Sequence, residues 1–85
     1  MSAEHIGPQR VHAYVLVKVE PGKAAGIVAR LRERIPDAAV HRVEGGYDIV
    51  VDVEAEAAEY VSAMARDQIR VIPAVTAHDV LIVTD

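Results

Sequence analysis

Apolar residues along the chain follow two different periods, which predict four strands and two helices. Strands are expected where short, mostly apolar runs are rich in β-branched residues, since such residues favour extended backbone. These runs cover residues 13–19, 39–43, 47–53 and 75–83. Helices are expected where apolar residues recur every three or four positions. The recurring residues are Ala24, Ile27, Val28, Leu31 and Ile35 in the first helix, and Ala58, Val61, Ala65, Ile69 and Ile72 in the second.

Proline and glycine residues mark where these elements end. Pro36 and Pro73 end the two predicted helices, because the residue before a proline disfavours helical backbone. Between the second and third strands, Gly45-Gly46 is expected to form a tight hairpin turn, since glycine adopts the positive φ that such turns require. The resulting order, strand-helix-strand-strand-helix-strand, predicts an α+β fold of the ferredoxin-like βαββαβ type.

An internal repeat supports this order of elements. Val17-Lys18-Val19-Glu20 recurs as Val51-Asp52-Val53-Glu54, and Ile35-Pro36 recurs as Ile72-Pro73. Each half of the chain therefore contains a strand, a helix and a second strand. The number of residues that separates the two copies is larger at the prolines than at the strands. The second helix is therefore expected to be the longer one.

The predicted sheet carries more apolar residues than two helices can cover. Helices on one face of a four-stranded sheet leave the other face to water, where polar residues normally alternate with apolar ones. Successive positions are instead apolar in residues 13–17, 49–51 and 80–83, and strand side chains point alternately to the two faces. An uncovered apolar face of this extent is typical of an interaction surface. We therefore expect two copies of the chain to pack their sheets together as a homodimer.

Length and composition indicate one small domain. Eighty-five residues leave no room for a second hydrophobic core. Residues 1–10 are mostly polar and are interpreted as an N-terminal tail, and residues 11–85 as the folded domain. A monomer whose sheet is covered by this tail is the alternative to self-association, and the polarity of the tail disfavours it. The hydrophobic share of 52% is high for so short a chain, which indicates either a dense core or apolar surface that contacts a partner.

The net charge and the length of the apolar runs restrict the classes of partner and the cellular compartment that are expected. The formal net charge of -4 disfavours direct binding to nucleic acid. No run reaches the roughly 18 apolar residues of a membrane span, and the first ten residues lack an apolar leader. Cysteine is absent, so no thiolate metal site is expected. These observations predict a cytoplasmic protein that contacts neither membrane nor DNA.

Three stretches carry a resemblance to a known family. They are the first strand, residues 13–19, the segment Gly45-x-Tyr47-Asp48-Ile49, and Ile72-Pro73-x-Val75 before the last strand. Together they resemble the effector-binding (RAM) domain of the Lrp/AsnC family of transcriptional regulators, and the Gly-x-Tyr-Asp turn is the most specific part. The resemblance covers essentially the whole chain after about Arg10. In that family a helix-turn-helix domain precedes this one, so the chain resembles a stand-alone version that does not read DNA.

The resemblance implies a regulatory module without enzymatic activity, cofactor or metal. Domains of the family pair into a dimeric α/β barrel, and dimers associate into rings, commonly octamers, with an amino-acid effector bound between dimers. Full-length regulators of the family are further candidate partners. Carried onto this sequence, the ligand-binding residues are Gly45, Tyr47, Asp48, His78 and Val80. His78 and Val80 stand where the family often has threonines, and Ala74 stands where it usually has glycine.

The expected site residues each have two interpretations. The Asp48 carboxylate suits an amino-acid ammonium group, with backbone N–H groups of the glycine turn binding the carboxylate, but it also suits the turn's own N–H groups. Gly45 suits turn geometry as well as ligand contact through its backbone. Tyr47 suits packing on a strand as well as closure over a ligand.

A small enzyme of the dimeric α/β-barrel type, a cofactor-free monooxygenase or an isomerase, is the alternative function. It would need a polar group in a pocket between helices and sheet, and the apolar stripes offer almost none. His12, His41 and His78 fall on three predicted strands and are able to cluster there, but no pair has the spacing of a compact metal site. We interpret them as surface or interface residues, so the binding module is favoured.

Overall fold

Strands and helices follow one another in the order that the sequence predicts. The computed structural model describes residues 10–85, so nearly all of the predicted tail lies outside the described residues. The elements are β1 (Val11–Val19), α1 (Ala24–Arg34), β2 (Ala39–Arg42), β3 (Ile49–Ala55), α2 (Ala58–Met64), the π-helical segment η2 (Ala65–Arg70) and β4 (Val75–Ile82). No helix in this part of the chain combines the length and hydrophobicity needed to cross a membrane.

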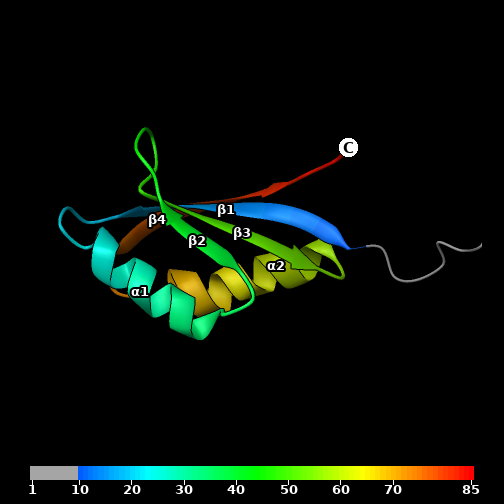
Figure 1. Cartoon of the computed structure of the whole chain (residues 1–85), viewed down its shortest axis with the longest axis horizontal. Coiled ribbons are helices and arrows are strands. Elements are labelled where there is room, and N and C mark those ends of the chain that lie inside the picture. The colour runs from blue at the N-terminus through cyan, green and yellow to red at the C-terminus, as the bar shows by residue number, and fades with distance from the viewer. Residues whose placement is uncertain (1–9) are drawn as a thin grey trace, which may run out of the picture.

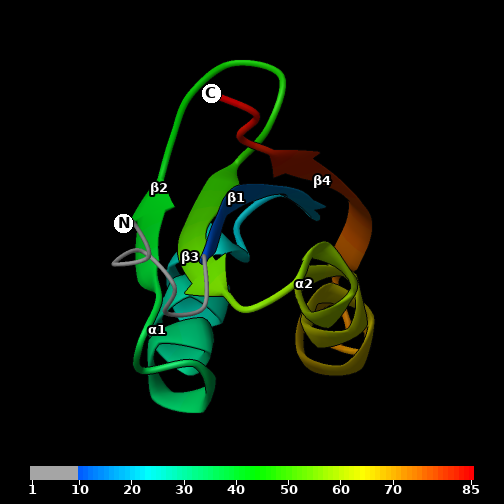
Figure 2. The same cartoon turned by 90° about the vertical axis from the view of Figure 1, so that its right-hand side faces the viewer.

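The four strands form one antiparallel sheet in the order β2-β3-β1-β4. Both helices lie on the same face of this sheet (Figures 1 and 2). The ferredoxin-like βαββαβ prediction is therefore confirmed. β1 begins two residues earlier than expected and β3 ends two residues later, because the two strands pair along their whole length, from Val11 opposite Ala55 to Val17 opposite Ile49.

The hydrophobic core lies between this face and the helices. Ala13, Val15 and Val17 of β1 and Ile49 and Val51 of β3 are fully buried there. Both predicted helix stripes meet them: Ala24, Ile27, Val28 and Leu31 are buried on α1, and Val61, Ala65, Ile69 and Ile72 on and after α2. Within residues 10–85, the buried set contains no polar or charged residue.

The second helix changes its winding at Ala65, where the α-helix becomes a π-helix. The buried residues Val61, Ala65 and Ile69 are each four positions apart. Over four residues, an α-helix rotates by slightly more than one full turn, whereas the wider π-helix rotates by slightly less than one. The two drifts offset each other, so all three side chains face the sheet. α2 and η2 contain 7 and 6 residues, against 11 in α1, so the second helix is the longer one, as expected.

The tight Gly45-Gly46 hairpin is a wrong prediction. Pairing of β2 with β3 ends at Arg42 opposite Ile49, and residues 43–48 form a longer connection, the β2–β3 loop. The Val43 N–H donates to the Asp48 carbonyl over 3.0 Å and closes this loop. Gly45 has φ of 132°, but Gly46 does not have a positive φ. The loop projects beyond the sheet in Figure 1.

The uncovered face of the sheet, here called the open face, mixes apolar and charged residues. Its members follow from strand alternation and register. They are His12, Tyr14, Leu16 and Lys18 of β1, Ala39 and His41 of β2, Val50, Asp52 and Glu54 of β3, and Ala77, Asp79 and Leu81 of β4. Tyr14, Leu16 and Val50 are half-buried, and Leu81 is 49% exposed. Apolar residues thus occur on all three longer strands of this face, but charged residues and histidines separate them, so the face is less apolar than the sequence indicated.

Ala74 has a backbone conformation that suits glycine. Its φ is 82°, in the left-handed region, where a Cβ is unfavourable. The residue connects η2 to β4, and its carbonyl accepts a hydrogen bond of 2.9 Å from the Glu20 N–H. This contact ties the connection to the end of β1 and holds Ala74 in the unfavourable region.

We predict that Ala74→Gly stabilises the fold. Relief of the left-handed strain, about 1–2 kcal/mol, exceeds the extra backbone entropy of glycine in the unfolded chain, about 0.4–1 kcal/mol. The free energy of unfolding, measured by urea denaturation, should rise by about 0.5–1 kcal/mol. Ala77→Gly, at an exposed position of β4 without positive φ, is the control and should lower it by a similar amount. Equal destabilisation by both substitutions would contradict strain at Ala74.

Candidate functional site

A surface recess of about 350 Å³ lies between the start of α1 and the end of the β2–β3 loop. It is called the recess below. Its lining consists of Val19, Glu20, Pro21, Gly22, Ala24, Ala25, Arg42 and Asp48. Of the five residues expected from the sequence to bind a ligand, Asp48 alone is in this lining.

Asp48 extends the pairing of β3 with β1 by one residue. Its N–H donates to the Val17 carbonyl over 2.9 Å, and its carboxylate Oδ2 accepts from the Val19 N–H over 2.9 Å. β3 begins at Ile49 opposite Val17, so Val19 has no strand partner on that side. The side chain of Asp48 therefore replaces the missing strand. Within residues 10–85, its other oxygen, Oδ1, has no hydrogen-bonding partner and is available to a ligand.

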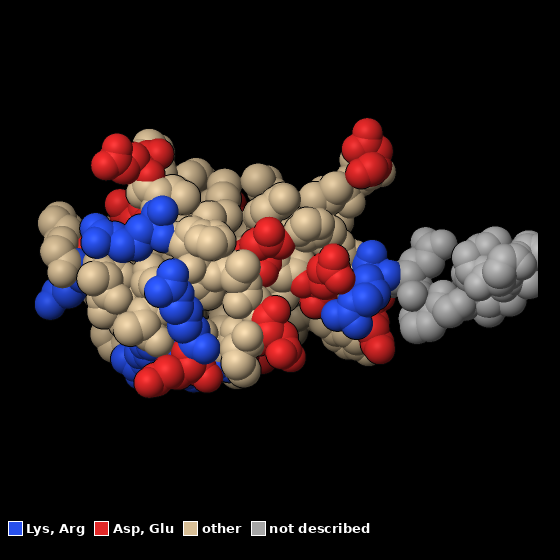
Figure 3. Space-filling view, viewed as in Figure 1, with Lys and Arg blue, Asp and Glu red and all other residues tan. Residues whose placement is uncertain are grey.

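Arg42 brings the opposite charge to the same recess. It is the last residue of β2 and directly precedes the β2–β3 loop, whereas Asp48 is the last residue of that loop. The two ends of one loop thus contribute an arginine and an aspartate to the lining of the same recess. In the described part of the chain, Arg42 forms no ion pair. Figure 3 shows basic side chains gathered at the α1 end of the molecule, with acidic side chains more frequent toward the other end.

The rest of the lining is mostly small and apolar. Val19, Pro21, Ala24 and Ala25 offer methyl and methylene groups beside the two charges. A cation, an anion and a short apolar wall complement a small zwitterion, because each charged end of such a ligand gains a charge-assisted hydrogen bond. Arg42 is the residue that sequence reasoning missed. Arg42 pairs with Ile49, the residue after Asp48, and this pairing brings it close to Asp48. Only the strand register reveals the pairing.

Tyr47 points away from the recess and onto the open face. Its hydroxyl donates a hydrogen bond to the Asp79 carboxylate, and the Lys18 Nζ lies 5.8 Å from the centre of its ring. The hydrogen bond to Asp79, together with burial and the negative charge of Asp79, raises the pKa of Tyr47 above 10.0. Gly45 is outside the recess lining too, and its φ of 132° gives it a conformational role in the loop.

His78 and Val80 lie on the helix-covered face. They pair with Val17 and Val15 of β1, whose side chains are in the core, and residues directly opposite in a sheet share a face. Asp79, between them, is on the open face. Within one chain, the structure therefore does not bring His78 and Val80 to Asp48.

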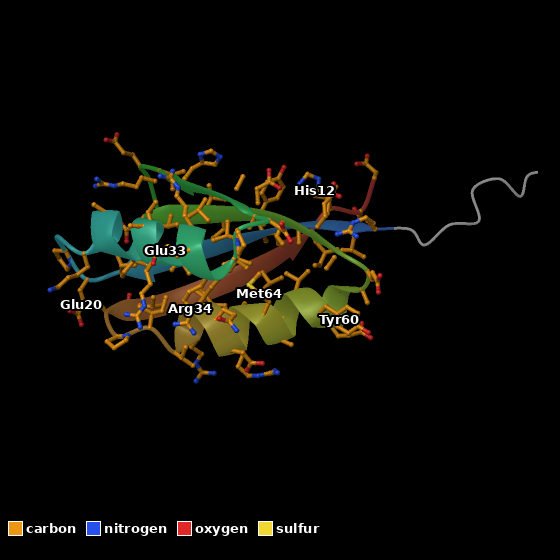
Figure 4. The ribbon with its side chains drawn as sticks, turned by 60° about the horizontal axis from the view of Figure 1, so that its bottom comes forward. His12, Glu20, Glu33, Arg34, Tyr60 and Met64 are labelled. Carbon is orange, nitrogen blue, oxygen red and sulfur yellow. The ribbon has the colours of Figure 1, made fainter. Side chains whose placement is uncertain are left out.

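The three histidines on strands do not cluster. The His12 Nε2 lies 2.6 Å from the Asp52 Oδ1 on the open face, and the His12 ring lies 5.1 Å from that of Tyr14. His41 is exposed on the same face, and His78 is on the other one. Figure 4 shows His12 on one side of the sheet and α2, with Tyr60 and Met64, on the other. Residues 10–85 contain no group of three or more His, Cys, Asp or Glu residues suited to a metal ion.

Comparison with known proteins yields one family model and a set of similar structures. The model of the Lrp/AsnC ligand binding domain matches residues 12–85. Among proteins of curated function, none matches the sequence. TTHA0845 from Thermus thermophilus superposes with a TM-score of 0.79 at 22% identity, and the match covers 88% of this chain and 94% of that one.

Two similar structures are longer proteins. AsnC from E. coli has a TM-score of 0.79 and 17% identity, and the match covers 100% of this chain and 57% of AsnC. The transcriptional regulator NMB0573 from Neisseria meningitidis, determined as a complex with L-Met, has a TM-score of 0.76 and 15% identity, with 100% and 56% covered. The chain thus spans a little over half of these two proteins, and they share its fold.

We predict that Asp48→Ala lowers the free energy of unfolding by about 1–3 kcal/mol, because it leaves the half-buried Val19 N–H without a partner. Asp48→Asn keeps a side-chain oxygen and should lose less. Urea denaturation at neutral pH measures both. Glu44→Ala, at an exposed position of the same loop, is the control and should change stability by less than about 0.5 kcal/mol. Unchanged stability in Asp48→Ala would show that β1 does not need this carboxylate.

Proposed function

The chain belongs to the Lrp/AsnC ligand-binding domain family, and on this premise we propose that it is a non-enzymatic module that binds an amino acid in the recess. The observation that carries the proposal is the pair of opposite charges, Arg42 and Asp48, at the two ends of the β2–β3 loop. The complex of NMB0573 with L-Met supports this class of ligand.

The ligand fits the recess in one orientation. Its carboxylate faces the Arg42 guanidinium, which forms two parallel hydrogen bonds with such a group. Its ammonium group faces the Asp48 Oδ1, and its side chain lies against Val19 and Ala24. From the sequence, N–H groups of the loop are expected to bind the ligand carboxylate. In this proposal the Arg42 side chain binds it instead.

The other expected contacts require an assembly. Gly45, Tyr47, His78 and Val80 do not line the recess of a single chain. Gly45 and His78 would reach the ligand from a neighbouring copy, whereas Tyr47 is held on the open face and Val80 packs against the core. We therefore retain the expected ring of dimers, octamer-like, as part of the proposal, with the effector between dimers. The module acts in the cytoplasm, without binding DNA, and full-length regulators of the family are candidate partners.

The open face supports a dimeric α/β barrel. Leu16 and Val50 lie side by side at its centre, and Leu81 extends the apolar surface onto β4. Burying this face also buries Asp52 and Asp79, which is costly unless each has a partner. Both have one on the same face, because Asp52 contacts His12 and Asp79 accepts from Tyr47. Glu54, the third carboxylate of this face, has its Oε1 3.4 Å from the Arg10 Nε. A second copy is therefore able to cover the face without leaving any of these carboxylates unpaired.

The core supports a binding role over the enzymatic alternative. A barrel enzyme of this type would place an acid–base group between helices and sheet. In residues 10–85, the side chains buried there are all hydrophobic. Polar groups instead line surface hollows, of which the recess is one.

We predict that the recess binds at least one common amino acid and that both charges contribute. Loss of a hydrogen bond to a charged group costs about 1.5–3 kcal/mol, so Arg42→Gln and Asp48→Asn should each weaken binding by roughly 10- to 150-fold in titration calorimetry. The amide of the same amino acid lacks the carboxylate that faces Arg42. It should therefore bind the wild type more weakly than the amino acid does, whereas Arg42→Gln should bind the two about equally.

Arg34→Gln is the matched control for this experiment. Arg34 is on the last turn of α1 and bonds to Gln68, away from the recess, so its loss should leave affinity unchanged. Absence of binding by every common amino acid at millimolar concentration would refute the proposed ligand class.

We further predict that the wild type sediments as a dimer or a larger multiple of the 9.2 kDa chain. Leu16→Lys should shift it to the monomer while its circular dichroism is retained, because Leu16 is on the open face and outside the core between sheet and helices. Ala29→Lys, at an exposed position of α1, is the control and should keep the assembly. A wild type that sediments as a monomer at micromolar concentration would rule out self-association through this face.

A further inference from the structure

Two consecutive residues of the β2–β3 loop serve opposite sides of the sheet. Tyr47 contacts Asp79 and Lys18 on the open face, whereas Asp48 lines the recess. A single peptide unit therefore connects the open face with the carboxylate proposed to bind the ligand. A change in the position of Tyr47 moves Asp48 with it.

The Tyr47 side chain crosses a whole strand to reach its partner. Tyr47 precedes Ile49 of β3, which pairs with one edge of β1, and Asp79 is on β4, which pairs with the other edge. The ring therefore lies over β1, where the Lys18 Nζ is 5.8 Å from its centre, within the range of a cation–π contact. Tyr47, Asp79 and Lys18 are called the clasp below, and they join the loop to β1 and β4.

The rest of the β2–β3 loop has little packing to hold it in place. No heavy atom lies within 4 Å of a Cβ built on Gly45 or Gly46, so this part of the loop is surrounded by open space. Glycine also has more backbone freedom than any other residue. The hydrogen bonds that hold the loop lie at its two ends, between Val43 and Asp48 and between Asp48 and β1, and in the clasp.

We propose that Asp79 is a positioning residue for the recess, which acts through Tyr47. By holding the Tyr47 hydroxyl, Asp79 fixes the peptide that carries Asp48, so that one carboxylate oxygen stays on the Val19 N–H and the other stays directed to the ligand. The role in ligand binding rests on the proposed function, whereas the positioning of the loop does not. Asp79 itself is outside the recess lining and touches no ligand.

The first test follows the loop without any ligand. Amide hydrogen exchange at Asp48 and Val19 should rise roughly five- to tenfold in Asp79→Asn and in Tyr47→Phe, as expected for loss of one anchoring hydrogen bond. Exchange at Leu31, in the core of α1, should not change. Asp67→Asn, an exposed carboxylate on η2 paired with Arg66, is the matched control. Unchanged exchange at Asp48 in the Asp79 variant overturns the proposal.

A spectroscopic signature separates the clasp from a general loss of structure. Because Asp79 raises the pKa of Tyr47, the hydrogen bond persists through neutral pH and is lost only as the pH rises through that raised value. Asp79→Asn should therefore lower the pH at which one tyrosinate appears in the near-ultraviolet spectrum. Tyr47→Phe should abolish this step, which assigns it to Tyr47 rather than Tyr14 or Tyr60. A titration that Asp79→Asn does not move contradicts the clasp.

The second test uses L-methionine, the amino acid bound by NMB0573, as the probe in titration calorimetry. Asp79→Asn should weaken its binding about tenfold at unchanged stability, and Asp67→Asn should not. If exchange at Asp48 rises but the affinity for L-methionine is unchanged, Asp79 does not position the recess and the proposal fails. If the wild type does not bind L-methionine or any other amino acid, the proposed function fails, and the exchange and tyrosinate measurements still decide whether Asp79 holds the loop.

Discussion

The alternation of side chains along β1 is the constraint on which the rest of the structure depends. β1 is hydrogen-bonded on both edges, and Ala13, Val15 and Val17 are fully buried beneath the helices. The residues between them necessarily point to the open face. β3 and β4 take their register from this strand, so the composition of both faces follows from it. Because β3 begins opposite Val17, the next free N–H of β1, at Val19, is left for Asp48, and the recess forms at that point.

Charge is placed at the edges of an apolar fold. The core between sheet and helices contains no polar side chain within residues 10–85, so every ionisable group is at the surface or on the open face. On the open face, Asp52 and Asp79 each have a partner, as a surface that becomes buried requires. In the recess, Arg42 and one oxygen of Asp48 have no such partner among residues 10–85, as a ligand site requires. The same residue types thus have different roles, which depend on whether their partners are already present.

The β2–β3 loop connects these two surfaces. Arg42, directly before the loop, and Asp48, its last residue, line the recess. Tyr47 lies on the open face. A loop with two glycines and little packing is easily displaced, so the hydrogen bonds at its end decide where the Asp48 carboxylate lies. The family to which the chain belongs is defined by ligand binding. On the proposal made above, Tyr47 connects the site of that function with the open face of the sheet.

Local periodicity determined the elements and the core, since helix and strand repeats depend only on residues close in sequence. The family was indicated separately, by a resemblance in three stretches of which the Gly-x-Tyr-Asp turn is the most specific. The βαββαβ order and the buried stripes from Ala24 to Leu31 and from Val61 to Ile72 were predictable in this way. Asp48 became a candidate, with two interpretations, through the family resemblance. The tertiary structure alone decided the loop length, the place of Arg42 beside Asp48, and the separation of Tyr47, His78 and Val80 onto different surfaces. These features depend on the register between strands that are distant in sequence. That register is set by how the two halves of the chain pack, and a shift of one residue would move every side chain to the other face.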